Sequence, residues 1–176
     1  MKLIILDRDG VINEDSDNYI RSPDEWQPIP GSIEAIARLN KAGYTVAVAT
    51  NQSGLGRGYY TRETLTAIHN KMISLVEAAG GHIACICFCP HTPDDNCNCR
   101  KPATGLVRQI ESNLNCTTED AWFVGDTITD IQVATACNCR PVLVKTGKGQ
   151  KTLDKGFAIA GVQVFESLKQ FADFLI

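Results

Sequence analysis

The chain alternates short apolar runs with segments whose apolar residues recur at helical spacing. Apolar, strand-like runs lie at 2–6, 45–49, 82–88, 121–124 and 141–144. Helical spacing predicts helices over 32–41, 61–79, 106–114, 131–136 and 165–175. Strands that are apolar almost throughout and alternate with helices indicate an α/β fold, in which helices cover both faces of a parallel sheet.

Polar residues follow four of the predicted strands. They occupy residues 7–10, 50–54, 100–101 and 125–127. Ligands of open α/β sheets bind beyond the carboxyl ends of the strands. We therefore expect these four segments to meet at one edge of the sheet and to form the functional site.

Three aspartates in these segments predict a metal site. Asp7, Asp9 and Asp126 would repel one another without a counter-charge. Mg²⁺ prefers oxygen ligands and binds carboxylates together with substrate phosphate. Because Gly10 indicates a turn, one of the first two aspartates can offer its backbone carbonyl instead of its side chain.

The same segments contain the groups that phosphoryl transfer requires. Asp7 can attack phosphorus and form an aspartyl-phosphate. Asp9, if it stays off the metal, can protonate the leaving oxygen and later deprotonate the attacking water. The Thr50 hydroxyl and the Lys101 ammonium can stabilise the phosphoryl group, and the Arg100 guanidinium suits a second anionic group.

The segments DRDGVIN, TNQSG, RKP and GDTITD resemble the four ordered motifs of the haloacid dehalogenase-like phosphatase superfamily. Within it, TNQSGLGRG, the CPH…CNCRKP loop and VLVKTGKG resemble the D,D-heptose 1,7-bisphosphate phosphatase family. The related histidinol-phosphate phosphatase domain shares part of this pattern. The resemblance implies a three-layer, Rossmann-like parallel sheet in a single domain over 1–176, with no room for a large cap domain between the first two motifs.

The resemblance also implies roles for individual residues. Asp7 is the implied nucleophile and Asp9 the acid/base. Mg²⁺ is held by Asp7, the Asp9 carbonyl and Asp126, while Thr50 and Lys101 stabilise the phosphoryl group. Substrate binding is implied for Asp15, Ser16, Asp17, Asn18, Asn51, Gln52, Ser53, Arg100 and Thr127. At Thr127 the chain departs from its relatives, which usually carry a cation there, so a phosphate contact at this position is in question.

The implied reaction is removal of the 7-phosphate from D-glycero-D-manno-heptose 1,7-bisphosphate, in the synthesis of nucleotide-activated heptose for lipopolysaccharide. DRDGVINED and VLVKTGKG favour this family over histidinol-phosphate phosphatase. A third hypothesis, from a different class, is a zinc-stabilised binding module without catalysis. The complete set of catalytic side chains argues against it.

Four potential zinc ligands lie in the stretch CPHTPDDNCNC. Cys89, His91, Cys97 and Cys99 form a Cys₃His set that matches a closed, structural tetrahedral site. A disulfide or an unligated loop are the alternatives. The remaining cysteines are interpreted as small buried apolar residues: Cys85, Cys87, Cys116, Cys137 and Cys139.

Composition narrows the class of protein. The 176 residues are 44% hydrophobic and 21% charged, with a net charge of −3 and no basic stripe, which argues against a dedicated nucleic-acid or membrane-surface binder. No run approaches the ~18 apolar residues of a membrane span, and the N-terminal apolar run is too short for a signal peptide. We expect a cytoplasmic monomer, where eight cysteines favour metal binding over disulfides.

The sequence leaves the roles of several polar residues open. Asp130 either caps the helix near it or supports Asp126 from behind. Arg57 and Lys148, both in Gly-rich stretches, either touch substrate phosphate or are simply solvated. His69 lies inside a predicted helix, where a histidine is more often a core or surface residue than a functional one.

Overall fold

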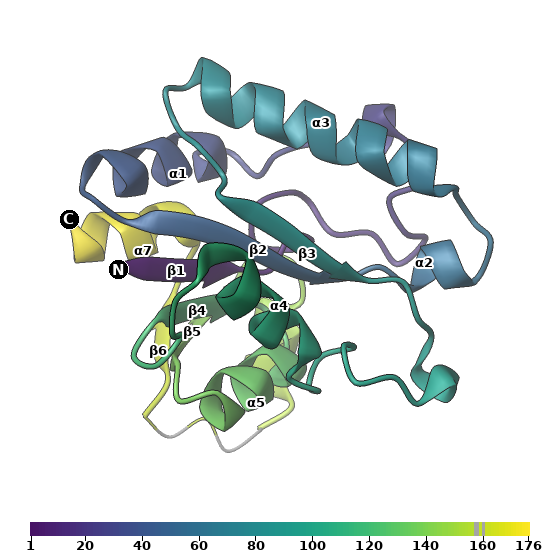
Figure 1. Cartoon of the computed structure of the whole chain (residues 1–176). Helices are drawn as coiled ribbons and strands as arrows, with labels where there is room; N and C mark the ends of the chain where they lie inside the picture. Colours follow the sequence, from purple (N-terminus) through teal and green to yellow (C-terminus); the bar gives the residue numbers. More distant parts are fainter. Residues whose placement is uncertain (157–158, 160) are drawn as a thin grey trace.

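The computed structural model describes residues 1–156, 159 and 161–176. These residues contain a six-stranded parallel sheet with the strand order β3-β2-β1-β4-β5-β6 (Figure 1). The strands are β1 (Leu3–Leu6), β2 (Thr45–Asn51), β3 (Cys85–Cys89), β4 (Trp122–Gly125), β5 (Arg140–Val144) and β6 (Gln163–Phe165). The chain moves outward in one direction from β1 to β3 and in the other from β4 to β6. The central pair β1 and β4 is therefore the switch point at which such sheets bind ligands.

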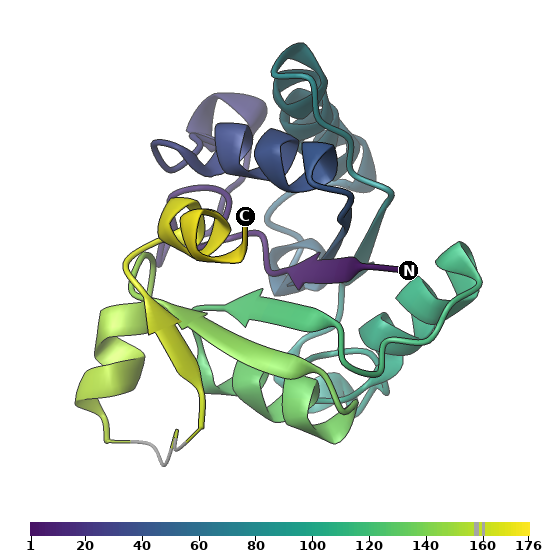
Figure 2. The same ribbon diagram turned by 90° about the vertical axis from the view of Figure 1, so that its left-hand side faces the viewer.

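The helices lie in two layers. Their bounds are α1 (Ser32–Lys41), α2 (Ser53–Gly56), α3 (Arg62–Ala78), α4 (Gly105–Leu114), α5 (Ile128–Ala136), α6 (Gly149–Asp154) and α7 (Leu168–Leu175), with the 3₁₀ turns η1 (Pro23–Glu25) and η2 (Pro93–Asp95). Helices α1, α3 and α7 cover one face of the sheet, and α4 and α5 cover the other (Figures 1 and 2). The predicted α/β sandwich of three layers is confirmed.

Strand β1 shows why its sequence is apolar without interruption. Ile4 and Leu6 point into the core beneath α1, α3 and α7, whereas Leu3 and Ile5 point into the core above α4 and α5. A strand that is buried on both faces has no solvent side, so the alternation of polar and apolar residues is lost. Side chains of both cores pack against β1, which fixes the position of its carboxyl end, where the polar residues begin.

The two connections that could hold a cap are short. Between β1 and α1 the chain forms a loop whose helical part is only η1. Between β2 and α3 it forms only the four-residue helix α2. Neither connection is long enough for a separate domain, which confirms the expected absence of a large cap.

Several predicted boundaries differ from the structure. The apolar run at 45–49 continues as strand through Thr50 and Asn51, and the run at 82–88 becomes a strand only at Cys85. Helix α5 begins at Ile128 rather than 131, because Thr127 caps it. The predicted helix 165–175 was wrong at its start: residues 163–165 pair with β5 as β6, and the helix begins after the Ser167 cap.

Two cysteines that were expected to be buried are only half-buried. Cys85 lies near the start of β3, an edge strand, and Cys116 follows the end of α4. Cys87, Cys137 and Cys139 are buried as predicted. None of the described helices is both long and apolar enough to cross a membrane.

Candidate active site

Asp7 lies directly beyond the end of β1, at the centre of the sheet. Its backbone N–H donates to the Val124 carbonyl at 3.0 Å, which ties it to β4. One carboxylate oxygen, Oδ1, accepts from the Arg8 backbone N–H at 2.8 Å and lies 3.0 Å from Lys101 Nζ. Burial and the neighbouring Asp130 raise the pKa of Asp7 well above its usual value, and Lys101 opposes this shift.

Lys101 enters the site from the loop that follows β3. Its ammonium donates to the Ala49 carbonyl at 2.8 Å and to Asp130 Oδ1 at 2.7 Å. Its backbone is held by Asn51, which accepts from the Lys101 N–H at 2.9 Å and donates to the Lys101 carbonyl at 3.2 Å. Burial disfavours the charge on Lys101, but Asp130 and Asp7 outweigh burial and raise its pKa, so it stays a cation.

Asp126 and Asp130 form the other side of the site. Asp126 Oδ2 accepts from the Lys148 backbone N–H at 2.8 Å, whereas Oδ1 is buried and has no hydrogen-bond partner among the described residues. Burial and Asp130 raise the pKa of Asp126 to about 7. Asp130 both caps α5, by accepting from the Thr127 N–H, and supports Asp126 by accepting from its N–H at 3.1 Å.

Carboxylate oxygens of Asp7, Asp126 and Asp130 lie within 4.8 Å of one another. This donor set and the partnerless Asp126 oxygen suit a hard cation with oxygen ligands. Gly10 allows the close approach. Its φ is +87°, and a Cβ at this position would overlap the Asp126 carboxylate, so any other residue would displace this carboxylate.

Asp9 lies beside this cluster with a quarter of its side chain exposed. Its Oδ1 accepts from Arg8 Nε at 2.8 Å and from Asn13 Nδ2 at 2.9 Å, while Oδ2 is 3.4 Å from Gln52 Nε2. Burial raises the pKa of Asp9, but the Arg8 cation and these hydrogen bonds outweigh burial and hold it below its usual value. Gln52 also donates to the Thr50 hydroxyl at 2.9 Å, so it links Asp9 to Thr50.

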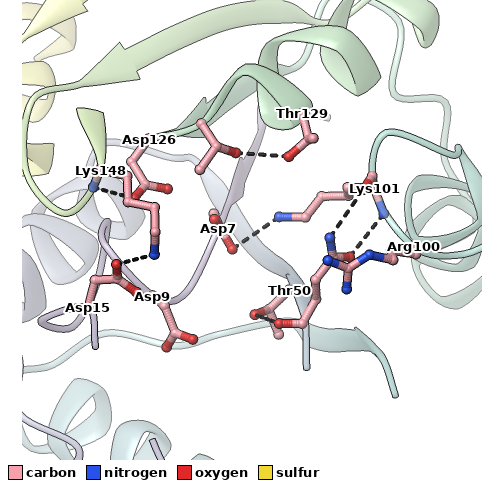
Figure 3. Close-up of a pocket in the computed structure, with 11 residues that line it drawn as sticks. Asp7, Asp9, Asp15, Thr50, Arg100, Lys101, Asp126, Thr129 and Lys148 are labelled. Atoms are coloured by element: carbon pink, nitrogen blue, oxygen red, sulfur yellow. Dashed lines mark hydrogen bonds and ion pairs between the residues drawn. The ribbon is translucent and has the colours of Figure 1, made fainter. Parts of the chain in front are cut away.

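These side chains surround a cavity of about 230 Å³ (Figure 3). Lys101 points at Asp7 from one side, and the ion pair of Lys148 with Asp15 lies on the other. The cavity is lined by Asp7, Asp9, Asp15, Thr50, Asn51, Arg100, Lys101, Asp126, Thr127, Thr129 and Lys148. A smaller hollow of about 140 Å³ shares part of this lining and adds Ser16, Tyr19, Ile20, Gln52 and Ser53.

Most of the predicted substrate-binding residues line one of these two hollows, but not all do. Asp17 and Asn18 are exposed and line neither. Asn51 does line the cavity, but its side-chain amide forms hydrogen bonds with the Lys101 backbone. Thr127 also lines it, but its hydroxyl caps α5 and lies 3.0 Å from Asp130 Oδ2. The sequence therefore predicted much of the lining, but not which partner each side chain binds.

Comparison with known proteins decides the family. The "HAD-hyrolase-like" family model matches residues 98–171. D-glycero-beta-D-manno-heptose-1,7-bisphosphate 7-phosphatase of Pseudomonas aeruginosa PAO1 is 55% identical over 99% of this chain and 97% of its own length. The chain belongs to the heptose 1,7-bisphosphate phosphatase family of HAD-like phosphatases. The Yersinia pestis relative of the same name is 39% identical over 82% of this chain and 81% of its own length.

Solved structures agree with this family. D,D-heptose 1,7-bisphosphate phosphatase of Bordetella bronchiseptica, complexed with magnesium and phosphate, superposes with a TM-score of 0.96 at 50% identity, covering 99% of this chain and 98% of that one. The Burkholderia thailandensis enzyme has a TM-score of 0.78 at 44% identity, covering 99% of both chains. The HAD-like fold predicted from the four motifs is confirmed.

The cysteine loop of this family member gathers three sulfurs. Cys99 Sγ lies 3.0 Å from Cys89 Sγ, and Cys97 Sγ lies 3.6 Å from Cys89 Sγ. All eight cysteines are free thiols. His91 is not part of this cluster, because its side chain is half-exposed and its Nδ1 faces Asp95 at 3.8 Å. The predicted ligands thus come together as a trio, with the histidine nearby on the same loop.

Two residues beside the site, Arg8 and His69, were not assigned to it from the sequence, and the role of Lys148 was left open. Lys148 lines the cavity and pairs with Asp15. Arg8 and His69 lie behind Asp9, where Arg8 Nη1 is 3.2 Å from His69 Nε2. Arg8 could have been found from its place between Asp7 and Asp9, but its burial has no sequence signature.

Proposed function

We propose that this chain hydrolyses a phosphate monoester of a small phosphorylated sugar through an aspartyl-phosphate on Asp7, with the 7-phosphate of D-glycero-D-manno-heptose 1,7-bisphosphate as its substrate. One observation carries the proposal. The buried Asp7 carboxylate and the buried Lys101 ammonium, 3.0 Å apart, meet at a cavity whose other wall is built from carboxylates. The 55% identity to an enzyme of this name supports the choice of substrate.

In the first step, an Asp7 oxygen attacks phosphorus and the bond to the sugar oxygen breaks. The Lys101 ammonium and the Thr50 hydroxyl stabilise the charge on the phosphoryl oxygens. Asp9 gives its proton to the departing sugar oxygen. Its pKa is low in the resting site, and the negative charge of an entering phosphate raises it, which favours the protonated form when substrate is bound.

In the second step, water attacks the phosphorus of the aspartyl-phosphate. Asp9, now a carboxylate, takes the proton of this water. The bond between phosphorus and Asp7 breaks, which releases inorganic phosphate and restores the Asp7 carboxylate. Asp9 therefore returns to the protonation state in which it began.

We propose Mg²⁺ as the resident cation, held by Asp7, the Asp9 carbonyl and Asp126. When bound, Mg²⁺ would offset the repulsion among these carboxylates and the phosphate. Asp130 stays off the metal in this proposal, because its two oxygens are used by Lys101 and by the N–H groups at the start of α5. The buried, partnerless oxygen of Asp126 supports this assignment.

Two cations flank the cavity beyond Lys101 and suit the second phosphate of a bisphosphate. Arg100 lines both hollows, and Lys148 enters from the opposite side. Asp15, Ser16, Gln52 and Ser53 line the smaller hollow, where hydroxyl groups of a sugar would find donors and acceptors. We propose a sugar orientation in which the second phosphate lies between Arg100 and Lys148.

We propose that Cys89, Cys97, Cys99 and His91 hold a structural Zn²⁺. The sulfurs of Cys89 and Cys97 are 3.6 Å apart, close to the ~3.8 Å between two ligands of a tetrahedral site with Zn–S bonds of about 2.3 Å, and metal binding would widen the 3.0 Å between Cys89 and Cys99. Rotation of the half-exposed His91 side chain would supply the fourth ligand. We propose a cytoplasmic, monomeric enzyme of lipopolysaccharide precursor synthesis, in a reducing compartment where the clustered cysteines favour metal binding over disulfides.

A phosphate-release assay with Mg²⁺ tests the function. It compares both anomers of the heptose 1,7-bisphosphate with histidinol phosphate, using the wild type and Asp7→Asn. We expect the highest kcat/KM on a heptose bisphosphate and no turnover by the folded Asp7→Asn variant. A higher kcat/KM on histidinol phosphate would overturn the substrate, and turnover by Asp7→Asn would overturn the nucleophile.

A further inference from the structure

Arg8 stands between the two aspartates of the site but does not face the cavity. Its side chain is completely buried, and it is absent from the lining of both hollows. Nε and Nη2 both lie 2.8 Å from Asp9 Oδ1. An arginine beside a nucleophile suggests a residue that binds phosphate. Arg8, however, points away from the cavity and forms an ion pair with Asp9, so phosphate cannot reach it.

The remaining nitrogen of the guanidinium contacts His69. Arg8 Nη1 lies 3.2 Å from Nε2 of this histidine, which projects from α3 and is 7% exposed. Because a guanidinium can only donate, Nε2 must accept, which makes the ring neutral with its proton on Nδ1. Burial and the Arg8 charge, which lower the pKa of His69 to about 3, favour the same form. Phe88 of β3 borders the ring, with centroids 6.1 Å apart.

We propose that Arg8 and His69 are positioning residues for Asp9. They fix its carboxyl group so that one oxygen is fully engaged and the other faces the reacting atoms. Oδ1 is held by Arg8 and Asn13, whereas Oδ2 has only a 3.4 Å contact with Gln52. The proton is therefore exchanged at Oδ2. This inference rests on the proposed role of Asp9 in the proposed function.

His69 matters because it supplies the acceptor for Arg8 Nη1, while Nη2 has only its ion-pair contact with Asp9 and no hydrogen-bond partner among the described residues. Without an acceptor at Nε2, a buried N–H of the guanidinium would lose its partner, and the group would move to find another. Asp9 would move with it. Catalytic groups tolerate little displacement, since a shift of 1 Å can cost on the order of 100-fold in rate. Arg8 also orients Asp7 through its backbone N–H, so one residue links both catalytic carboxylates.

The test separates proton donation from general damage by using two leaving groups. Release of the heptose product requires a proton from Asp9, whereas p-nitrophenolate leaves p-nitrophenyl phosphate without one. Single-turnover rates of leaving-group release are measured for the wild type, His69→Leu, which removes the acceptor, and His69→Gln, which restores one. Arg8→Lys is a second probe should His69→Leu not fold, and His82→Leu, at an exposed histidine, is the matched control.

We expect His69→Leu to slow heptose release by about tenfold, with p-nitrophenolate release unchanged. His69→Gln should recover most of this loss, and His82→Leu should behave as the wild type. Equal slowing of both leaving groups, or no recovery in His69→Gln, would show a merely structural role and overturn the proposal. Asp9→Asn tells this failure apart from failure of the proposed function: only the latter predicts unchanged turnover in Asp9→Asn.

Discussion

The ammonium of Lys101 lies 2.7 Å from Asp130 Oδ1, and both side chains are almost completely buried. Lys101 is thus held in place before any phosphate arrives. A charge that is already positioned need not reorganise during the reaction, which is the basis of electrostatic catalysis. Asp130 has a second set of contacts, to the first N–H groups of α5, so the cation and the helix share one carboxylate.

Asp130→Asn should impair both activity and stability. The neutral amide leaves the buried Lys101 with less compensating charge, and breaking a buried ion pair costs about 3–5 kcal/mol. We expect kcat to fall at least about tenfold and the free energy of unfolding to drop by about 3 kcal/mol. Steady-state kinetics and urea unfolding measure the two effects. Asp154→Asn, on the exposed side of α6, should change the unfolding free energy by less than about 0.5 kcal/mol; a similar loss there would remove the specificity of the result.

Stabilisation by Mg²⁺ should depend on pH. The raised pKa values of Asp126, about 7, and of Asp7 mean that the folded, metal-free chain binds protons at these sites above the usual 3.8. Its unfolding free energy should therefore fall as the pH rises from about 4 to 7. Mg²⁺ competes with these protons, so the increase in Tm on adding Mg²⁺ should be large at pH 8 and small at pH 5.5. An equal increase in Tm at both pH values would contradict the proposal that Asp7 and Asp126 hold Mg²⁺. The Asp126→Asn variant should lose most of the increase in Tm that Mg²⁺ causes in the wild type.

Zinc binding should require Cys99, and loss of the zinc should lower kcat through the position of Lys101. Metal analysis of the wild type should give about one zinc per chain. Cys99→Ser should lose it and lower kcat by about tenfold, because Lys101 follows two residues later and its loop loses an anchor. The half-buried Cys116, outside the cluster, gives the matched control: Cys116→Ser should keep both zinc and activity. Full activity in a zinc-free Cys99→Ser protein would show that the hydrogen bonds of Asn51 are a sufficient anchor for Lys101.

Lys148 should contribute to binding of the second phosphate rather than to chemistry. Its side chain lines the cavity, about 43% exposed, and pairs with Asp15. We expect Lys148→Met to raise KM for the bisphosphate by about tenfold while kcat stays nearly constant, since a uniform binding contact is lost. A substrate with a single phosphate should show no such change. Lys145→Met is the control, because Lys145 pairs with Glu166 away from the cavity. A fall in kcat for both substrates would place Lys148 in the reaction itself.

Much of the fold and of the site could be predicted from the sequence. Runs such as LIIL are unambiguous because burial on both faces leaves no polar position, and strand ends of a parallel sheet necessarily share one edge. Asp7, Thr50, Lys101 and Asp126 line one cavity for that reason. Strand β6 was missed because three residues at a sheet edge carry too little periodicity to stand apart from the helix that follows.

What could not be predicted is which partner each polar group chooses. Asn51 lines the cavity, but the sequence did not indicate that its amide also holds the backbone of Lys101, fifty positions away. Arg8 carries a guanidinium, a group that often binds phosphate, but it is buried and donates a hydrogen bond to Asp9 instead. Such choices depend on distances across the fold. A linear pattern indicates where a side chain starts, but not what lies at its far end.

The hydrogen bond from the Asp7 amide to Val124 has a consequence for motion. It lies at the junction of β1 and β4, inside the sheet rather than in a loop. Opening it requires the two central strands to separate, which is close to complete unfolding. In hydrogen–deuterium exchange, the amide of the proposed nucleophile should therefore be among the slowest to exchange, while the amide of the exposed Asp17 should exchange rapidly. The backbone that carries the proposed nucleophile would then be one of the most rigid parts of the molecule, and the exposed loop after β1 would be the part that adapts to the substrate.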